Sequence, residues 1–264
     1  RPLKDGVIAD FRITEILLTH FINKLNLKGI FARPTILICR PSNITSIEKS
    51  AIRDVAERCG AKKVFIEEEP KVAAIGAGLE INKPTGNMVI DIGGGTTDIA
   101  VLSLGDIVTS SSLKIAGDVM DADIIKFVKD KLLIGDRTAE QIKLEIGSAV
   151  KGSSDKTFEV RGRDLVTGLP HTITITSNET ELALRETCAT IVKETKHVLE
   201  QTPPELAADI VSRGIFLTGG GALLTGLDRL LESELNVPVF VADDALNCVA
   251  NGCGVMLENL HYMK

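Results

Sequence analysis

The sequence predicts an α/β fold. Short β-branched and aliphatic runs alternate with segments of helical period along the chain, which is typical of stacked layers of helix and sheet. At two places such a run leads directly into three consecutive glycines. Hydrophobic residues make up 44% and charged residues 25% of the 264 residues, which excludes a disordered or fibrous chain.

Composition narrows the class of protein further. The net charge of −6 disfavours a general nucleic-acid binder, which needs a basic surface, so we expect no nucleic-acid partner. No apolar run approaches the roughly 18 residues of a membrane span, and no secretory signal opens the chain. The five cysteines are an odd number without a Cys-x-x-Cys pair, which indicates a reduced, cytoplasmic protein.

The first 80 residues predict three helices separated by strands. Thr45 and Glu48 have the spacing of a capping box, and Pro70 suits the first turn of a helix. The predicted helices span 11–25, 45–59 and 70–79, and the predicted strands span 35–39 and 64–66.

The rest of the chain continues the alternation. Gly105 and Asp106 predict a turn between two antiparallel strands, and Pro203 ends a long helix. Capping boxes are predicted at Thr138–Gln141 and Asn178–Glu181. The predicted strands span 88–91, 99–104, 106–111, 158–161, 171–176, 215–218 and 237–241. The predicted helices span 121–133, 138–146, 178–201, 223–235 and 245–260.

The two triple-glycine segments, 89–98 and 215–222, resemble each other. Glycine allows a sharp turn and lets a phosphate approach backbone N–H groups with no Cβ in the way. Thr96 and Thr97 add hydroxyl donors, and Asp91 at the strand end could hold Mg²⁺ through water. A pair of tight structural turns is the plainer alternative, but two such loops at strand ends favour a nucleotide site. Neither loop is a Walker A motif or a Gly-x-Gly-x-x-Gly fingerprint.

Longer motifs resemble a known family. DIGGGTTDIAVL is similar to the second phosphate loop of the actin, sugar-kinase and heat-shock-chaperone ATPases, and LTGGGALLTGLDRL is similar to their adenosine loop. Five further stretches narrow the resemblance to the MreB family of bacterial actins, which includes paralogues such as Mbl. These are EEEPKVAAIGAGLEI, GDIVTSSSLKIAGD, IGDRTAEQIKLEIGSA, RGRDLVTGLPHTI and LEQTPPELAADI. The resemblance covers essentially the whole chain.

This resemblance implies an actin-like ATPase fold, with two ribonuclease-H-like halves around a nucleotide cleft. Residues 1–80 would be the remainder of the first half, with 245–264 packing back on it. Residues 81–244 would be the second half, including a smaller inserted subdomain at about 117–190. The family opens with an Asp-x-Gly-Thr loop that we do not find before Asp91, and the chain begins with Arg1. We therefore expect the first half to be incomplete at its N-terminus and to leave apolar surface uncovered.

The resemblance also implies ATP and Mg²⁺ as cofactors. Phosphate would be bound by Gly93, Gly94, Gly95 and Thr96, and adenosine would lie beside Gly219, Gly220, Gly221 and Ala222. Asp91 would hold the metal through water. Glu140, Gln141, Ile142 and Lys143 would flank the ribose and adenine, although spacing alone favours an ordinary surface salt bridge between Glu140 and Lys143.

Glu69 is the candidate catalytic residue, with Thr96 as its partner across the site. A carboxylate before Pro70 could orient the water that attacks the γ-phosphate. Spacing alone does not separate this role from that of one more solvated charge, so the assignment rests on the family motif. Hydrolysis would be weak and would time filament turnover.

The implied function is that of a polymerising cytoskeletal protein. It would form membrane-associated filaments from copies of itself and direct cell-wall synthesis with the elongation machinery, which maintains rod shape. Ile30 and Phe31 would form a small apolar membrane loop, so the protein would be cytoplasmic and peripheral at the inner membrane face. The alternatives are a sugar or acid kinase, a chaperone-type ATPase, or an actin-like cell-division protein.

Overall fold

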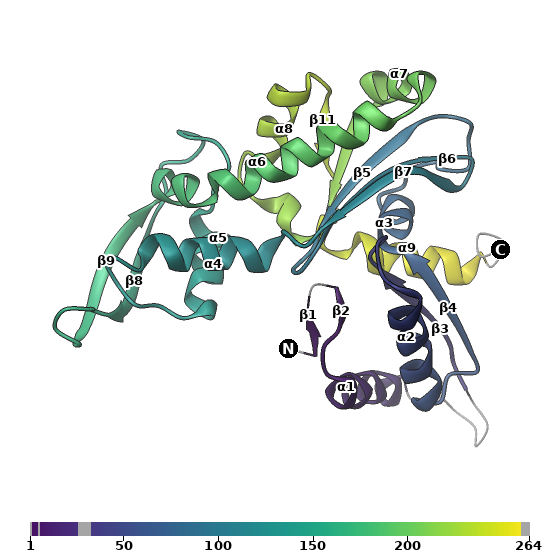
Figure 1. The fold of residues 1–264 in the computed structure, drawn as a ribbon, viewed down its shortest axis with the longest axis horizontal. Coiled ribbons are helices and arrows are strands. Elements are labelled where there is room, and N and C mark those ends of the chain that lie inside the picture. The colour runs from purple at the N-terminus through teal and green to yellow at the C-terminus, as the bar shows by residue number, and fades with distance from the viewer. Residues whose placement is uncertain (1, 5, 26–32, 260–264) are drawn as a thin grey trace.

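A five-stranded mixed sheet forms the centre of the molecule (Figure 1). The computed structural model describes residues 2–4, 6–25 and 33–259. The strand order is β11–β10–β5–β6–β7, where β5 pairs in parallel with β10 and antiparallel with β6. The bounds are β5 Asn87–Ile92, β6 Thr97–Ser103, β7 Asp106–Leu113, β10 Ile215–Thr218 and β11 Val239–Val241. Every residue of β5 and β6 is buried, so helices cover both faces.

Side chains alternate between two hydrophobic cores across this sheet. On one face, Val89 and Ala100 belong to a small core with residues of α3 (Glu69–Gly76). On the other face, Met88 and Ile90 join a larger core that includes α6 (Ser177–Gln201), α7 (Pro204–Arg213) and α8 (Leu227–Leu235). Pro204 lies in the first turn of α7, a helix that the sequence analysis did not predict.

Helix α9 (Cys248–Glu258) packs directly across α3 on the side of the small core. The two backbones approach closely at glycines. A Cβ added at Gly76 would clash with the carbonyl of Cys248, and one added at Gly252 would clash with the carbonyl of Val72. The predicted helix 245–260 is broken near its start. A short 3₁₀ turn, η2 (Ala245–Asn247), precedes α9.

One end of the molecule carries α4 (Gly117–Val128), α5 (Asp136–Ile146) and the antiparallel hairpin of β8 (Thr157–Arg163) and β9 (Pro170–Thr176), as Figure 1 shows. The predicted capping box at Thr138–Gln141 is wrong, because α5 begins two residues earlier with Gly135 as its N-cap. The box predicted at Asn178–Glu181 is also displaced. Thr176 and Glu179 form it instead, at the start of α6.

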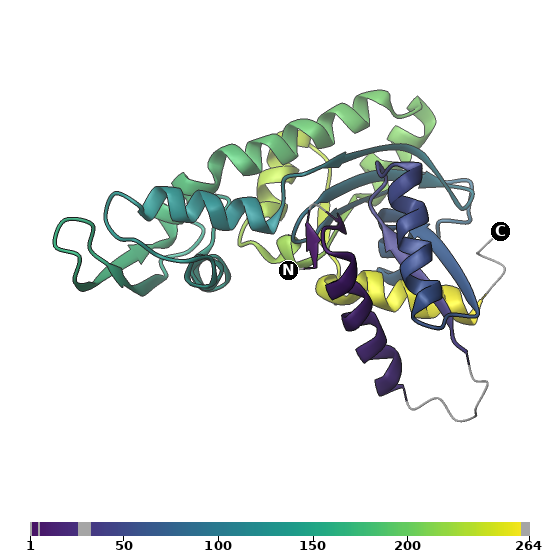
Figure 2. The ribbon, with the colours of Figure 1, turned by 60° about the horizontal axis from the view of Figure 1, so that its bottom comes forward.

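The N-terminal part contains β1 (Leu3–Lys4), β2 (Val7–Ile8), α1 (Phe11–Lys24), β3 (Thr35–Arg40), α2 (Ser46–Arg58) and β4 (Lys63–Glu68). β3 and β4 form a parallel pair, and the predicted capping box at Thr45–Glu48 is present. Figure 2 shows α1 projecting away from the central sheet, and none of its residues is buried. No described helix combines the length and apolar character that crossing a bilayer requires.

Candidate functional site

Both triple-glycine loops begin at the carboxyl ends of neighbouring strands, β5 and β10, of the central sheet. β5 and β10 are parallel neighbours, and Asp91 lies opposite Thr218 in the register. The Thr218 hydroxyl donates to Asp91 Oδ1 at 2.8 Å. Any Cβ at Gly219 or Gly221 would clash with Ile92, the last residue of β5. The two loops that the sequence singles out are therefore in contact at one site.

The first loop is held by backbone hydrogen bonds within itself and to the start of α4. The Gly93 N–H donates to the Thr96 carbonyl at 2.9 Å. The Gly117 and Asp118 N–H groups donate to the carbonyls of Gly93 and Gly94 at 3.1 and 2.8 Å. Gly94 is exposed, while Gly93 and Gly95 are half-buried, so the tip of the loop is open to a ligand.

The second loop is held by a contact with the segment that follows β11. Gly219 has a φ of +80°, which favours glycine, and its N–H donates to the Ala245 carbonyl at 2.7 Å. The turn continues as η1 (Gly220–Leu223), in which the Ala222 side chain is buried. The predicted helix 223–235 is accordingly split into η1 and α8. The loop thus connects β10 to η2 and α9 as well as to β5.

Three carboxylates crowd beside these loops. Asp91 is only 5% exposed, and burial, together with the charge of Asp98, raises its pKa to about 6 despite the hydrogen bond from Thr218. Burial and the charges of Asp91, Asp98 and Cys253 raise the pKa of Glu69 to about 8. Burial also raises the pKa of Asp98. Like charges this close favour a cation or protons among them.

Asp98 is a member of this group to which the sequence analysis gave no role. It lies opposite Asp91 on β6, and its Oδ1 accepts from the Ser42 N–H at 3.0 Å, which ties the loop after β3 to the site. Thr96, the predicted partner of Glu69, is buried, and its nearby side chain lowers the pKa of Asp98 against the larger effect of burial. The only sequence signal for Asp98 was its place at the end of the Gly-Gly-Gly-Thr-Thr-Asp motif.

Helix α5 brings Lys143 to the first loop. Its Nζ donates to the Gly117 carbonyl at 2.8 Å and pairs with Asp121 Oδ1 of α4 at 2.8 Å. Lys143 thus has partners on α4, so the surface salt bridge with Glu140, the alternative that spacing alone favours, is not what the structure shows.

The other residues of that stretch face different ways. Glu140 is half-buried and Gln141 is exposed, so both can face a ligand. The Ile142 side chain is fully buried in the larger core, which leaves only its backbone available. Ile30 and Phe31 lie outside the described residues.

The described residues fit a metal held mainly through water and phosphate. No group of three or more His, Cys, Asp or Glu side chains in the described part of the chain is arranged to ligate a metal. Asp91 nevertheless lies at the loop junction, and a nearby divalent cation would offset the repulsion among the three carboxylates.

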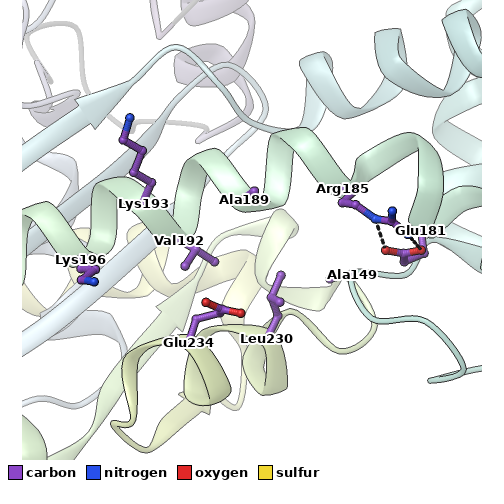
Figure 3. Close-up of a pocket in the computed structure, with 9 residues that line it drawn as sticks. All are labelled: Ala149, Glu181, Arg185, Ala189, Val192, Lys193, Lys196, Leu230 and Glu234. Carbon is purple, nitrogen blue, oxygen red and sulfur yellow. Dashed lines mark hydrogen bonds and ion pairs between the residues drawn. The ribbon is translucent and has the colours of Figure 1, made fainter.

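A separate groove of about 520 Å³ lies between α6 and α8 (Figure 3). In it, Arg185 donates twice to Glu181, at 2.9 Å each, and Leu230 of α8 lies below Val192 of α6. Its lining contains none of the residues predicted to bind nucleotide. The groove is therefore distinct from the loop site.

Comparison with known proteins gives consistent matches over nearly the whole of this chain. The family model described as MreB/Mbl protein matches residues 1–264. The chain is 62% identical to the cell shape-determining protein Mbl of Bacillus subtilis (strain 168) over 262 residues, which cover 98% of this chain and 79% of Mbl.

Solved structures of related proteins match the fold of this chain. MreB5 of Spiroplasma citri bound to ADP has a TM-score of 0.93 and 41% identity, over 98% of this chain and 78% of that one. The same protein bound to AMPPNP also gives a TM-score of 0.93, with 42% identity over 98% and 79% of the two chains. A MamK double helical filament shares the fold, with a TM-score of 0.84 and 21% identity over 97% and 80% of the two chains.

Proposed function

The chain belongs to the MreB/Mbl family of actin-like proteins, and we propose on that premise that it is a cell shape-determining cytoskeletal protein whose self-assembly depends on ATP. The observation that carries the proposal is the junction of the two triple-glycine loops at the ends of β5 and β10. A purine triphosphate placed there would meet backbone N–H groups from both loops at once. MreB5, at 41–42% identity, is a nucleotide-bound relative with this fold.

In this proposal the first loop holds the phosphates. Gly93, Gly94, Gly95 and Thr96 lie next to the carboxylates and to Lys143, whose ammonium group is held beside Gly117. Asp91 would hold Mg²⁺ through water, and the metal would neutralise phosphate charge. Gly219, Gly220, Gly221 and Ala222 would pass beside the adenosine, with Glu140 and Gln141 of α5 on the facing side.

Glu69 would orient the attacking water. It lies at the start of α3 among Asp91 and Asp98, and its raised pKa makes it a better proton acceptor than an ordinary glutamate once it is ionised. Hydrolysis would remain slow and would time filament turnover. We expect Glu69→Ala to slow phosphate release and to leave assembly intact, and faster release would contradict this role.

We also propose that the filaments lie at the inner face of the cytoplasmic membrane and engage the cell-wall elongation machinery. The apolar pair Ile30 and Phe31 would enter the lipid surface. One such pair buries little area, so each monomer would bind weakly and an array of linked subunits would bind firmly.

Sedimentation tests the proposal. We expect the chain to pellet with ATP and Mg²⁺, and to pellet with anionic lipid vesicles only when assembled. Asp91→Asn should abolish the ATP dependence, whereas the conservative change Glu145→Gln on the exposed face of α5 should not. No sedimentation with or without lipid, together with a soluble phosphorylated product from a sugar, would favour a kinase instead.

A further inference from the structure

Two thiols meet beside the loop site from distant parts of the chain. Cys39 of β3 and Cys253 of α9 are 214 residues apart in sequence, and their Sγ atoms lie 3.3 Å apart. Both side chains are half-buried, so small solutes can reach them. The other three of the five cysteines are separate: Cys188 and Cys248 are buried, and Cys59 contacts Thr19 and the Glu15 carbonyl.

Backbone packing holds this pair in place. Cys253 follows Gly252, where α9 lies so close to α3 that a Cβ would clash with the Val72 carbonyl. Cys39 lies within the paired part of β3, opposite Glu67 of β4. Since a disulfide needs the sulfur atoms about 2 Å apart, the thiols have to approach by only about 1 Å, which is within the reach of side-chain rotation.

We propose that Cys39 and Cys253 are a redox-sensitive pair, which hydroperoxides convert to an intramolecular disulfide and low-molecular-weight thiols restore. The Cys253 thiolate attacks one peroxide oxygen, the O–O bond breaks, and a sulfenic acid and hydroxide result. The Cys39 sulfur then attacks the sulfenic sulfur, the S–S bond forms, and water leaves. In sum, two thiols and one hydrogen peroxide give one disulfide and two waters.

The electrostatics assign the two roles. The hydrogen bond between the two thiols lowers the pKa of Cys253 more than burial raises it, which favours Cys253 as the attacking thiolate. The same hydrogen bond, then burial, and then the charges of Cys253, Glu69 and Asp91 raise the pKa of Cys39 well above its ordinary value. Cys39 therefore keeps its proton until the sulfenic acid has formed.

The bridge would also act on the nucleotide site, a consequence that rests on the proposed function. It would tie α9 to β3, and η2 immediately before α9 carries the carbonyl of Ala245 that holds Gly219 of the second loop. Restricting α9 therefore restricts the loop expected beside the adenosine. We expect the oxidised protein to release nucleotide several-fold more slowly than the reduced protein.

The test is to treat the nucleotide-free full chain with a modest excess of hydrogen peroxide and to count free thiols with a chromogenic disulfide. Thiols should fall from five to three, non-reducing peptide mapping should find Cys39 linked to Cys253, and dithiothreitol should restore all five. Cys39→Ser should prevent this link, and Cys59→Ser should leave it unchanged. Retention of all five thiols, or oxidation only to sulfinic acid or to bridges between chains, would overturn the proposal.

A second measurement tests the nucleotide-binding function and the redox-sensitive pair separately. Release of a fluorescent ATP analogue is followed before and after oxidation. If the reduced chain binds no nucleotide, the proposed function fails, while peptide mapping still decides the disulfide. If the mapped disulfide forms and release is unchanged, the coupling through α9 is wrong.

Discussion

The charge state of Glu69 should control the stability of the nucleotide-free protein. Replacing it by glutamine keeps the size of the side chain and removes its negative charge. Burial, followed by the charges of Asp91, Asp98 and Cys253, raises the pKa of Glu69 from its ordinary value of 4.5 to about 8. Ionising Glu69 therefore costs folding free energy, and the glutamine variant should avoid that cost.

The sign and size of the effect follow from linkage. Because the folded pKa lies above the unfolded one, the contribution of protonated Glu69 is fully present below pH 4.5 and is lost as the pH rises through about 8. Each factor of ten in proton affinity is worth about 1.4 kcal/mol, which gives a ceiling of about 4 kcal/mol between pH 5 and 8. Glu69 is only half-buried, so solvent screening reduces the expected effect to about 2 kcal/mol.

The assay is urea denaturation at pH 5 and pH 8 without nucleotide or divalent metal. We expect Glu69→Gln to be more stable than the unmodified chain by about 2 kcal/mol at pH 8 and by well under 1 kcal/mol at pH 5. Glu145→Gln, at an exposed position of α5, should change neither value. An equal difference at both pH values would refute the reasoning, because a packing effect does not depend on proton concentration.

Three other predictions test the site and the packing that supports it. Gly221→Val should weaken ATP binding at least tenfold by calorimetry, because its Cβ would enter the last residue of β5, whereas Gly254→Ala, whose added Cβ would meet nothing within 4 Å, should bind nearly normally. Lys143→Met should lower the free energy of unfolding, measured by urea denaturation, by about 2 kcal/mol, because it leaves the buried carboxylate of Asp121 on α4 without its cation. An unchanged free energy of unfolding would contradict the importance of that ion pair. Gly252→Ala should lower thermal stability by separating α9 from α3, while Gly254→Ala, with open space around it, should raise it slightly, and equal effects would contradict this packing.

Local sequence signals predicted the strands that carry the candidate site. The runs ending in triple glycine were correctly predicted as strands, because a continuous buried run followed by glycine has few other solutions. Capping boxes were less secure. The Thr45–Glu48 spacing was right, but Thr138–Gln141 lies inside a helix that Gly135 begins, since a Thr-x-x-Gln spacing also fits an ordinary first turn.

Local sequence signals did not predict the contacts between segments that are distant in the chain. The hydrogen bond from Ser42 to Asp98 joins residues 56 apart, and the contact of Cys39 with Cys253 spans 214. Neither leaves a periodic pattern, because each depends on how β3 and α9 pack against the central sheet. Residue spacing likewise indicated Glu140 as a partner for Lys143, whereas the structure pairs Lys143 with Asp121 of α4.

The three neighbouring carboxylates explain why binding of a nucleotide with its metal should change how the two glycine loops are held. Without a cation, burial raises the pKa of Asp91, Asp98 and Glu69, and the neighbouring carboxylates raise the pKa of Asp91 and Glu69 further. The metal of a bound triphosphate would attract the carboxylates at the junction of the two glycine loops. The first loop is hydrogen-bonded to the start of α4 and the second to η2. Since one attachment is to α4 and the other, through η2, leads to α9, ligand binding at this one junction would bias how both helices are held. That is the coupling that nucleotide-dependent assembly requires.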